Sequence, residues 1–211
     1  MRVAALLITA STALGLAGGA AEACQGQKVL YQDHFASLDA SWGTYGDELT
    51  VQDGRMVIRP EPGTVYWQVN DLGPYQDVDV CADVTIVTGV TPDEVLAGLV
   101  FWYVDDENLY ALEVDAAGHA SIWKQAAGDW REIVPWAETD LAATGDGKTQ
   151  HLRVVTSGRV ATAYIGDKKL TDVMSDFPLP DGGQKVGVIA GSATAGVSTV
   201  AFDEFILTAP R

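Results

Sequence analysis

Apolar and polar residues alternate strictly between residues 77 and 86. The even positions are apolar, and the odd positions from 77 to 85 carry Asp, Cys or Thr. Successive side chains of a strand point to opposite faces of its sheet. The segment therefore predicts a strand with one face in the core, formed by Val78, Val80, Ala82, Val84 and Ile86, and one in solvent, formed by Asp77, Asp79, Cys81, Asp83 and Thr85.

Short segments of the same kind recur along the chain. Asp53-Gly54 separates two β-rich arms in residues 49–60, a strong signal for a hairpin. Further strands are expected in ranges 28–35, 64–70, 150–173, 185–192 and 198–208. No stretch has a helical period with caps. Some dozen short strands with glycine-rich turns predict an all-β sandwich or jelly roll of two antiparallel sheets.

Residues 96–136 form the most regular part of this pattern, with four extended segments and three turns rich in Asp, Asn or Gly. This arrangement predicts a β-meander. It contains four of the six tryptophans: Trp102, Trp123, Trp130 and Trp136. Two interpretations stay open for these rings, because several aromatic residues on one sheet face can form a stacking platform or fill the core.

The first 23 residues read as a signal peptide. Arg2 is followed by a short apolar stretch and by Ala21-Glu22-Ala23, which resembles a cleavage site. A membrane anchor is the alternative, but Ala, Gly, Ser and Thr dilute the apolar stretch. We expect export to the periplasm or beyond the cell, no later membrane span, and one domain over residues 24–211.

Cys24 and Cys81 are the two cysteines of the chain. In an oxidising compartment, this count most simply predicts one disulfide between them. The alternative is that Cys24 is the lipidated first residue of a bacterial lipoprotein, although Ala21 and Glu22 depart from the usual signal for lipidation.

The formal net charge of −16 limits the partners of the protein. Such a surplus of carboxylates repels nucleic acid and anionic membrane surfaces, whereas neutral or cationic partners remain compatible. The three histidines lie far apart and near no cysteine at ligand spacing, so a zinc site is not expected.

A series of short motifs carries a resemblance to a known superfamily. They include Asp33-His34-Phe35, Asp53-Gly54, Ala97-Gly98-Leu99-Val100-Phe101, Asn108-Leu109-Tyr110, Gly128-Asp129-Trp130, Val186-Gly187-Val188 and Phe202-Asp203-Glu204-Phe205. Together they resemble the concanavalin A-like jelly rolls of bacterial secreted proteins, including laminin G-like and 3-keto-disaccharide hydrolase domains. The resemblance implies a β-sandwich that binds sugar on its concave face or rim. It also implies a structural calcium near the termini, with Asp33 and Asp203 as candidate ligands, although the simpler interpretation, which we favour, is that Asp203 is an ordinary solvent-facing residue.

Glu113-Val114-Asp115 resembles part of the catalytic strand of family 16 glucanases. A retaining glycosidase needs two carboxyl groups about 5 Å apart, and Gly118 occupies the position of the motif's third acidic residue. We therefore predict no catalytic residue from this motif.

A candidate sugar site follows from the assumed pairing of Val104 with Leu109. That register places Trp102, Ala111 and Glu113 on one face, opposite an apolar face formed by Phe101, Tyr103, Tyr110, Leu112 and Val114. An indole ring can stack on a pyranose while a carboxylate binds its hydroxyl groups. Trp67 is a further candidate, so the predicted ligand-binding residues are Trp67, Trp102 and Glu113.

The function predicted from these features is carbohydrate binding without catalysis, by an exported protein that we expect to be monomeric. The alternatives are a glycoside hydrolase of the 3-keto-disaccharide type and a protein–protein adhesion module. Fold resemblance alone cannot choose among them.

Overall fold

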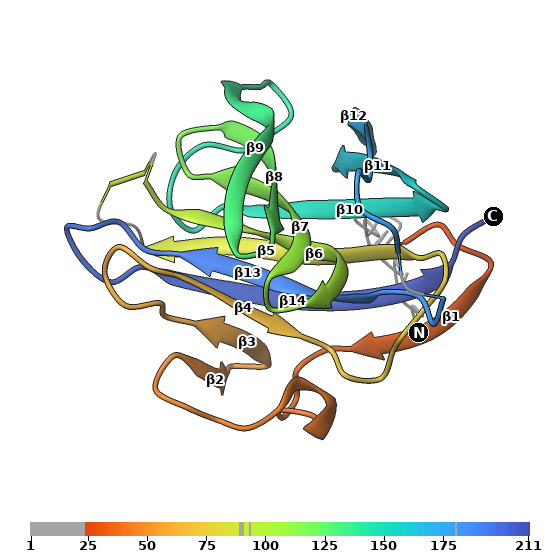
Figure 1. Cartoon of the computed structure of the whole chain (residues 1–211). Coiled ribbons are helices and arrows are strands. Elements are labelled where there is room, and N and C mark those ends of the chain that lie inside the picture. Colours follow the sequence, from red (N-terminus) through yellow and green to blue (C-terminus); the bar gives the residue numbers. More distant parts are fainter. Residues whose placement is uncertain (1–23, 89–90, 93, 180) are drawn as a thin grey trace, which may run out of the picture.

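A computed structural model describes residues 24–211 except 89–90, 93 and 180. The predicted signal peptide thus lies outside the described residues. Within them, no helix is long and apolar enough to cross a membrane. The described chain folds as an antiparallel β-sandwich, as predicted from the alternation (Figure 1).

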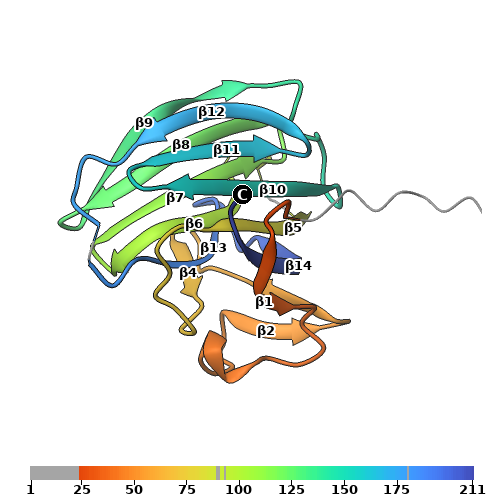
Figure 2. The same cartoon turned by 90° about the vertical axis from the view of Figure 1, so that its right-hand side faces the viewer.

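One sheet of the sandwich has the order β12-β11-β10-β5-β14-β3-β2, with β1 also paired to β14. In the described residues its strands are β1 (Lys28–Asp33), β2 (Leu49–Gln52), β3 (Arg55–Ile58), β5 (Asp79–Thr88), β10 (Thr149–Ser157), β11 (Val160–Ile165), β12 (Lys168–Met174) and β14 (Thr199–Ala209). A single 3₁₀ turn, η1 (Ala40–Trp42), lies between β1 and β2 among these residues. Figure 2 looks onto β10, β11 and β12, with the other sheet behind them.

The other sheet has the order β4-β13-β6-β7-β8-β9. Its strands, again within the described residues, are β4 (Val65–Val69), β6 (Leu96–Asp105), β7 (Asn108–Asp115), β8 (His119–Ala126), β9 (Asp129–Glu138) and β13 (Lys185–Gly191). Strands β6 to β9 are consecutive neighbours, which confirms the predicted meander. The face of this sheet that is turned away from the core is called the outer face below.

The hydrophobic core lies between the two sheets and follows the predicted alternation closely. On β7, Tyr110, Leu112 and Val114 point into the core, whereas Ala111 and Glu113 point to the outer face. The apolar positions predicted for residues 78–86 are likewise buried in the core. Asp53 and Gly54 both have positive φ, as a tight two-residue hairpin turn between β2 and β3 requires.

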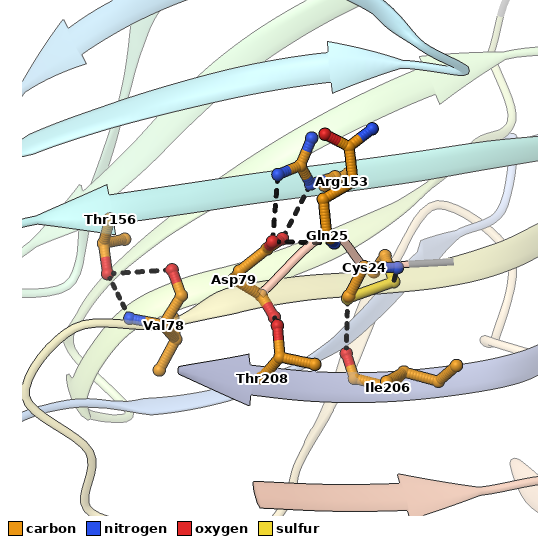
Figure 3. Close-up of polar contacts among 9 residues, drawn as sticks. Cys24, Gln25, Val78, Asp79, Arg153, Thr156, Ile206 and Thr208 are labelled. Atoms are coloured by element: carbon orange, nitrogen blue, oxygen red, sulfur yellow. Dashed lines mark hydrogen bonds and ion pairs between the residues drawn. A yellow bond between two sulfur atoms is a disulfide. The ribbon is translucent and has the colours of Figure 1, made fainter. Parts of the chain in front are cut away.

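The predicted solvent-facing side of residues 77–85 needs a correction. Asp79 and Cys81 are buried, with exposed fractions of 1% and 0%. The segment of Cys24 and Gln25 covers them: Cys24 forms the predicted disulfide with Cys81, and the backbone N–H of Gln25 donates to Asp79 Oδ2 at 2.9 Å (Figure 3). A segment more than fifty residues away in sequence thus buries a polar face that alternation assigned to water.

Candidate functional site

Glu113 lies on the outer face, near the C-terminal end of β7. Its cross-strand neighbours are Gly98 on β6 and Ser121 on β8, which are both small. Trp123, two residues along β8, shares this face, and Gln125 follows it. The alternation of β8 places Trp123 outward and the intervening Ile122 in the core.

A cavity of about 180 Å³ opens beside Glu113. Three half-buried tryptophans and two aliphatic residues complete its lining: Trp123, Trp130, Trp136, Val65 and Leu96. Trp123 comes from β8, whereas Trp130 and Trp136 come from the neighbouring edge strand β9. The meander thus brings together residues that are up to 40 positions apart, from Leu96 to Trp136.

Glu113 is almost completely buried in this cavity, with an exposed fraction of 3%. Its carboxyl group has no hydrogen-bond partner among the described residues, and burial raises its pKa from 4.5 to about 8. At neutral pH the group therefore keeps its proton. A buried acid without a partner is costly in a folded protein, and such groups are concentrated at functional sites.

Other polar groups on this part of the outer face also lack partners within the described chain. The indole Nε1 of Trp123 and the side-chain Oε1 of Gln125 are both buried without a hydrogen bond. Gln125 lies farther along β8, opposite Trp130, whereas Trp123 lines the Glu113 cavity itself. Since most buried polar atoms in folded proteins are paired, the unpaired Trp123 N–H beside an unpartnered carboxyl group marks this cavity as a candidate site for a polar ligand.

Trp67 extends the aromatic surface on the side of β4. It packs on the outer face with Ile189 and Val100, and its ring meets the Trp130 ring edge to face at a centroid distance of 6.0 Å. The structure therefore brings two predicted site residues, Trp67 and Glu113, to the same face of the sheet. They are connected through Trp130, which also lines the Glu113 cavity.

The predicted orientation of Trp102 is wrong. Trp102 is fully buried in the core beside Phe101 and Tyr110, on the opposite side of the sheet from Glu113. The assumed register holds at the turn, where Asp105 faces Asn108, but a bulge in β6 shifts it to Phe101 opposite Tyr110. Trp102 has a positive φ of 48° within this bulge. The irregular backbone rotates its ring inward.

Sequence reasoning placed Trp123, Trp130 and Trp136 in the meander without assigning them to the site. Alternation along β8 would have placed Trp123 with Glu113, because Glu113 faces Ser121. The strand β9 is harder to read, since its pairing with β8 shifts twice, around Ile122.

Asp115 follows Glu113 on the same face of β7, and its carboxylate is fully engaged. It accepts hydrogen bonds from the backbone N–H groups of Ala117 and His119 and from His119 Nδ1, which lies 2.6 Å from Asp115 Oδ2. These contacts close the turn between β7 and β8. Asp115 thus has a structural role here that Glu113 lacks.

The two predicted calcium ligands are not brought into a cluster of acidic side chains. The Asp33 carboxylate accepts from Tyr31 Oη, Trp42 Nε1 and the backbone N–H of Phe35. Asp203 accepts from the backbone N–H of Glu204. In the described part of the chain, no three His, Cys, Asp or Glu side chains are grouped so as to hold a metal ion. The calcium site stays a prediction.

A second cavity, of about 560 Å³, lies at the end of the sandwich near the turn between β10 and β11. Three charged side chains of its lining are already paired: Asp77 Oδ1 accepts from the Gly158 N–H, Arg159 donates to the Ser175 carbonyl, and Asp176 forms an ion pair with Lys124. Because most of its charged side chains are used within the protein, this cavity is the weaker candidate for a ligand site.

No protein-family model and no curated protein sequence matches the chain. Solved structures do match it in shape. The carbohydrate-binding module CBM66 from Bacillus subtilis superposes with a TM-score of 0.59 at 17% identity, over 73% of this chain and 86% of that one. A β-glucanase from Bacillus licheniformis gives 0.58 at 8% identity, over 84% and 97%. The chain has the concanavalin A-like jelly-roll fold.

A xylan β-1,4-xylosidase from Bacillus halodurans C-125 also matches, with a TM-score of 0.60 and 15% identity over 84% of this chain. The match covers 38% of the xylosidase, so there the sandwich corresponds to only part of a longer protein. Identities this low establish the jelly-roll fold and leave the chemistry of the Glu113 cavity to be argued from its own residues.

Proposed function

We propose that this protein binds carbohydrate through the outer-face cavity, without hydrolysing it. One observation carries the proposal: three tryptophan rings surround a buried carboxyl group that has no partner within the described chain. Indole rings provide flat apolar surfaces for a sugar ring, and the carboxyl group provides polar contacts for its substituents. Trp67 extends this surface next to Trp130.

The solved structures support this choice of ligand class, because those that superpose on the chain include a carbohydrate-binding module and glycan-degrading enzymes. The predicted signal peptide and the disulfide fit an exported protein that meets glycans outside the cytoplasm. The charge of −16 argues against polyanionic polysaccharides as ligands.

Binding to a panel of polysaccharides and to a glycan array would test the proposal. Trp123→Ala and Trp130→Ala should each weaken binding about tenfold or more, as expected for aromatic residues at the centre of a site. Trp102→Phe is the matched control, since it changes a tryptophan of the opposite, core-facing side. Equal affinities for all three variants and the parent would overturn the proposal.

Glycoside hydrolysis is the second candidate, and the state of Glu113 favours it. A carboxyl group that keeps its proton at neutral pH is what a general acid requires. A retaining mechanism also needs a second carboxylate nearby. Of the acidic residues near Glu113 on this face, Asp115 is held by His119 and the turn, and Glu132 on β9, which faces Trp123, accepts from the Trp136 backbone N–H. Release of reducing or oxidised sugar that is abolished in Glu113→Gln would establish hydrolysis in place of simple binding.

A further inference from the structure

Among the described residues, the cavity around Glu113 contains no counter-charge. The neighbours of Glu113 across the sheet are Gly98 and Ser121, and the described residues that line its cavity include no lysine, arginine or histidine. A buried carboxyl group in a folded protein is normally paired with a cation or hydrogen-bonded, because leaving it alone is unfavourable. The carboxyl group is therefore suited to bind a ligand that carries a positively charged or strongly hydrogen-bonding group.

The aromatic lining favours a cation as this group. Trp123, Trp130 and Trp136 all contribute to the wall of the cavity that holds Glu113. The face of an indole ring attracts a positive charge, more strongly in a site that excludes water, and an aromatic cage is a common means of binding ammonium groups. A cation in this cavity would contact both the π systems and the carboxylate.

The long-range field and the size of the cavity agree with a small cationic group. The net charge of −16 attracts cations towards the protein. A volume of about 180 Å³ is below the roughly 300–1,000 Å³ typical of pockets for larger ligands, so the cavity accommodates one sugar residue or substituent.

From these observations we infer that the outer-face cavity selects an amino sugar with a free ammonium group, which Glu113 binds as a carboxylate while the three tryptophans surround it. This inference rests on the proposed function and specifies its ligand. N-acetylated and neutral sugars lack the charge and are bound less tightly at the same position.

Binding of the cation includes a proton transfer. The free protein holds a protonated Glu113 at neutral pH, because burial raises the pKa of this carboxyl to about 8. An ammonium group favours the ionised carboxylate, so its arrival lowers that pKa and the carboxyl proton leaves to the buffer. About one proton should be released for each ammonium sugar that binds.

Other ionisable groups lie around this site and must be separated from Glu113. Asp115, paired with His119, follows it on β7, and Glu132 on β9 faces Trp123 and accepts from the Trp136 backbone N–H. The cross-strand neighbours on β6 and β8 and the lining residue Val65 on β4 carry no charge. Glu113→Gln leaves the Asp115–His119 pair and Glu132 in place, so the difference between parent and variant isolates Glu113.

The test uses glucosamine oligosaccharides and N-acetylglucosamine oligosaccharides of equal length as probes, with isothermal titration calorimetry at about pH 6, where an amine of normal basicity stays protonated. We expect at least about tenfold tighter binding of the deacetylated oligosaccharide, as a desolvated cation–π and ion-pair contact implies. Titrations in two buffers of different ionisation enthalpy should give a release of about one proton. Glu113→Gln should lose both the preference and the proton release.

The outcomes separate this inference from the function on which it rests. Equal or tighter binding of N-acetylated or neutral sugars that depends on Trp123 and Trp130 would overturn the inference and leave carbohydrate binding standing. Absence of binding to every sugar would overturn both. If Glu113→Gln keeps the preference for the deacetylated probe, Glu113 is not the group that binds the ammonium; a circular dichroism spectrum matching the parent would exclude misfolding of the variant.

Discussion

Asp79 and Glu113 are buried to a similar degree, with exposed fractions of 1% and 3%, but their surroundings differ in kind. Asp79 on β5 accepts two hydrogen bonds from Arg153, at 2.7 and 2.9 Å, and one from the Gln25 N–H (Figure 3). Glu113 on β7 accepts none among the described residues. Burial alone thus does not distinguish a structural acid from a candidate binding group, whereas the set of hydrogen-bond partners does.

The region around Asp79 ties the segment of Cys24 and Gln25 to the sheet that contains β5. Arg153 comes from β10 and also stacks on the Tyr164 ring of β11, at 4.8 Å from its centroid. The Cys24–Cys81 disulfide lies in the same region, and the Cys24 sulfur is 3.0 Å from the Ile206 carbonyl oxygen (Figure 3). Every polar group named here has its partner inside the protein, which is the pattern of a purely structural region.

Removal of the Asp79 carboxylate should have the largest effect on stability. In Asp79→Ala, the Arg153 guanidinium and the Gln25 N–H lose the carboxylate to which they donate. We therefore expect a loss of about 3–5 kcal/mol in the free energy of unfolding. Urea denaturation at neutral pH measures it. Asp172→Ala, at an exposed pair with Lys169, is the control and should show no measurable change. A loss below about 1 kcal/mol for Asp79→Ala would show that the pair is not structurally important.

Removal of the disulfide should come next. Replacing Cys24 and Cys81 together by Ala releases a loop with a sequence separation of 57 residues, and the expected loss is about 2–4 kcal/mol. The urea midpoint of the double variant should equal that of the parent under reducing conditions. If reductant leaves the stability of the parent unchanged while the double variant is less stable than the parent, the packing of the sulfur atoms rather than the covalent bond stabilises this region.

The two regions were not equally predictable from sequence. Alternation along residues 78–86 and along β7 gave the correct core face, because period-two spacing fixes the direction of side chains in a regular strand. The burial of Asp79 was missed, since it depends on contacts with Gln25 and Arg153, which are remote in sequence. Alternation describes one strand and carries no information on what covers its second face.

The candidate site shows a second limit of sequence pattern. Glu113 was placed on the outer face correctly, but the Trp102 ring was assigned to the wrong face because its strand contains a bulge. Glycine commonly marks such a bulge, but the segment in which the register shifts, from Phe101 to Asp105, contains no glycine. The register shifts between β8 and β9 likewise made it impossible to predict from alternation that Trp130 and Trp136 lie close to Glu113.

The pH dependence of stability distinguishes the two acids further. Because the folded pKa of Glu113 is raised from 4.5 to about 8, the folded state keeps a proton that the unfolded chain releases in this interval, and stability falls as pH rises through it. Glu113→Gln removes this loss. The variant should be more stable than the parent by up to about 3 kcal/mol at pH 7 and equal to it near pH 4.

Urea titrations across this pH range would measure the difference. Glu107→Gln, at the exposed turn between β6 and β7, is the control, since its curve should run parallel to that of the parent. Parallel curves for Glu113→Gln as well would mean that water or a neighbour already stabilises the ionised carboxylate. The contrast with Asp79 would then be smaller than the contacts indicate.

The smallest effect on stability is expected for a tryptophan of the cavity wall. Trp136 is half-buried on β9, an edge strand of its sheet, so Trp136→Ala should lower the free energy of unfolding by only about 1 kcal/mol. Trp102→Ala, in the core, serves as the reference and should cost several times more. A large side chain that contributes little to stability is better explained by contact with a ligand than by packing. If Trp136→Ala and Trp102→Ala lower the free energy of unfolding by the same amount, Trp136 stabilises the fold as much as a core residue does. The cavity that it lines would then have a structural rather than a binding role.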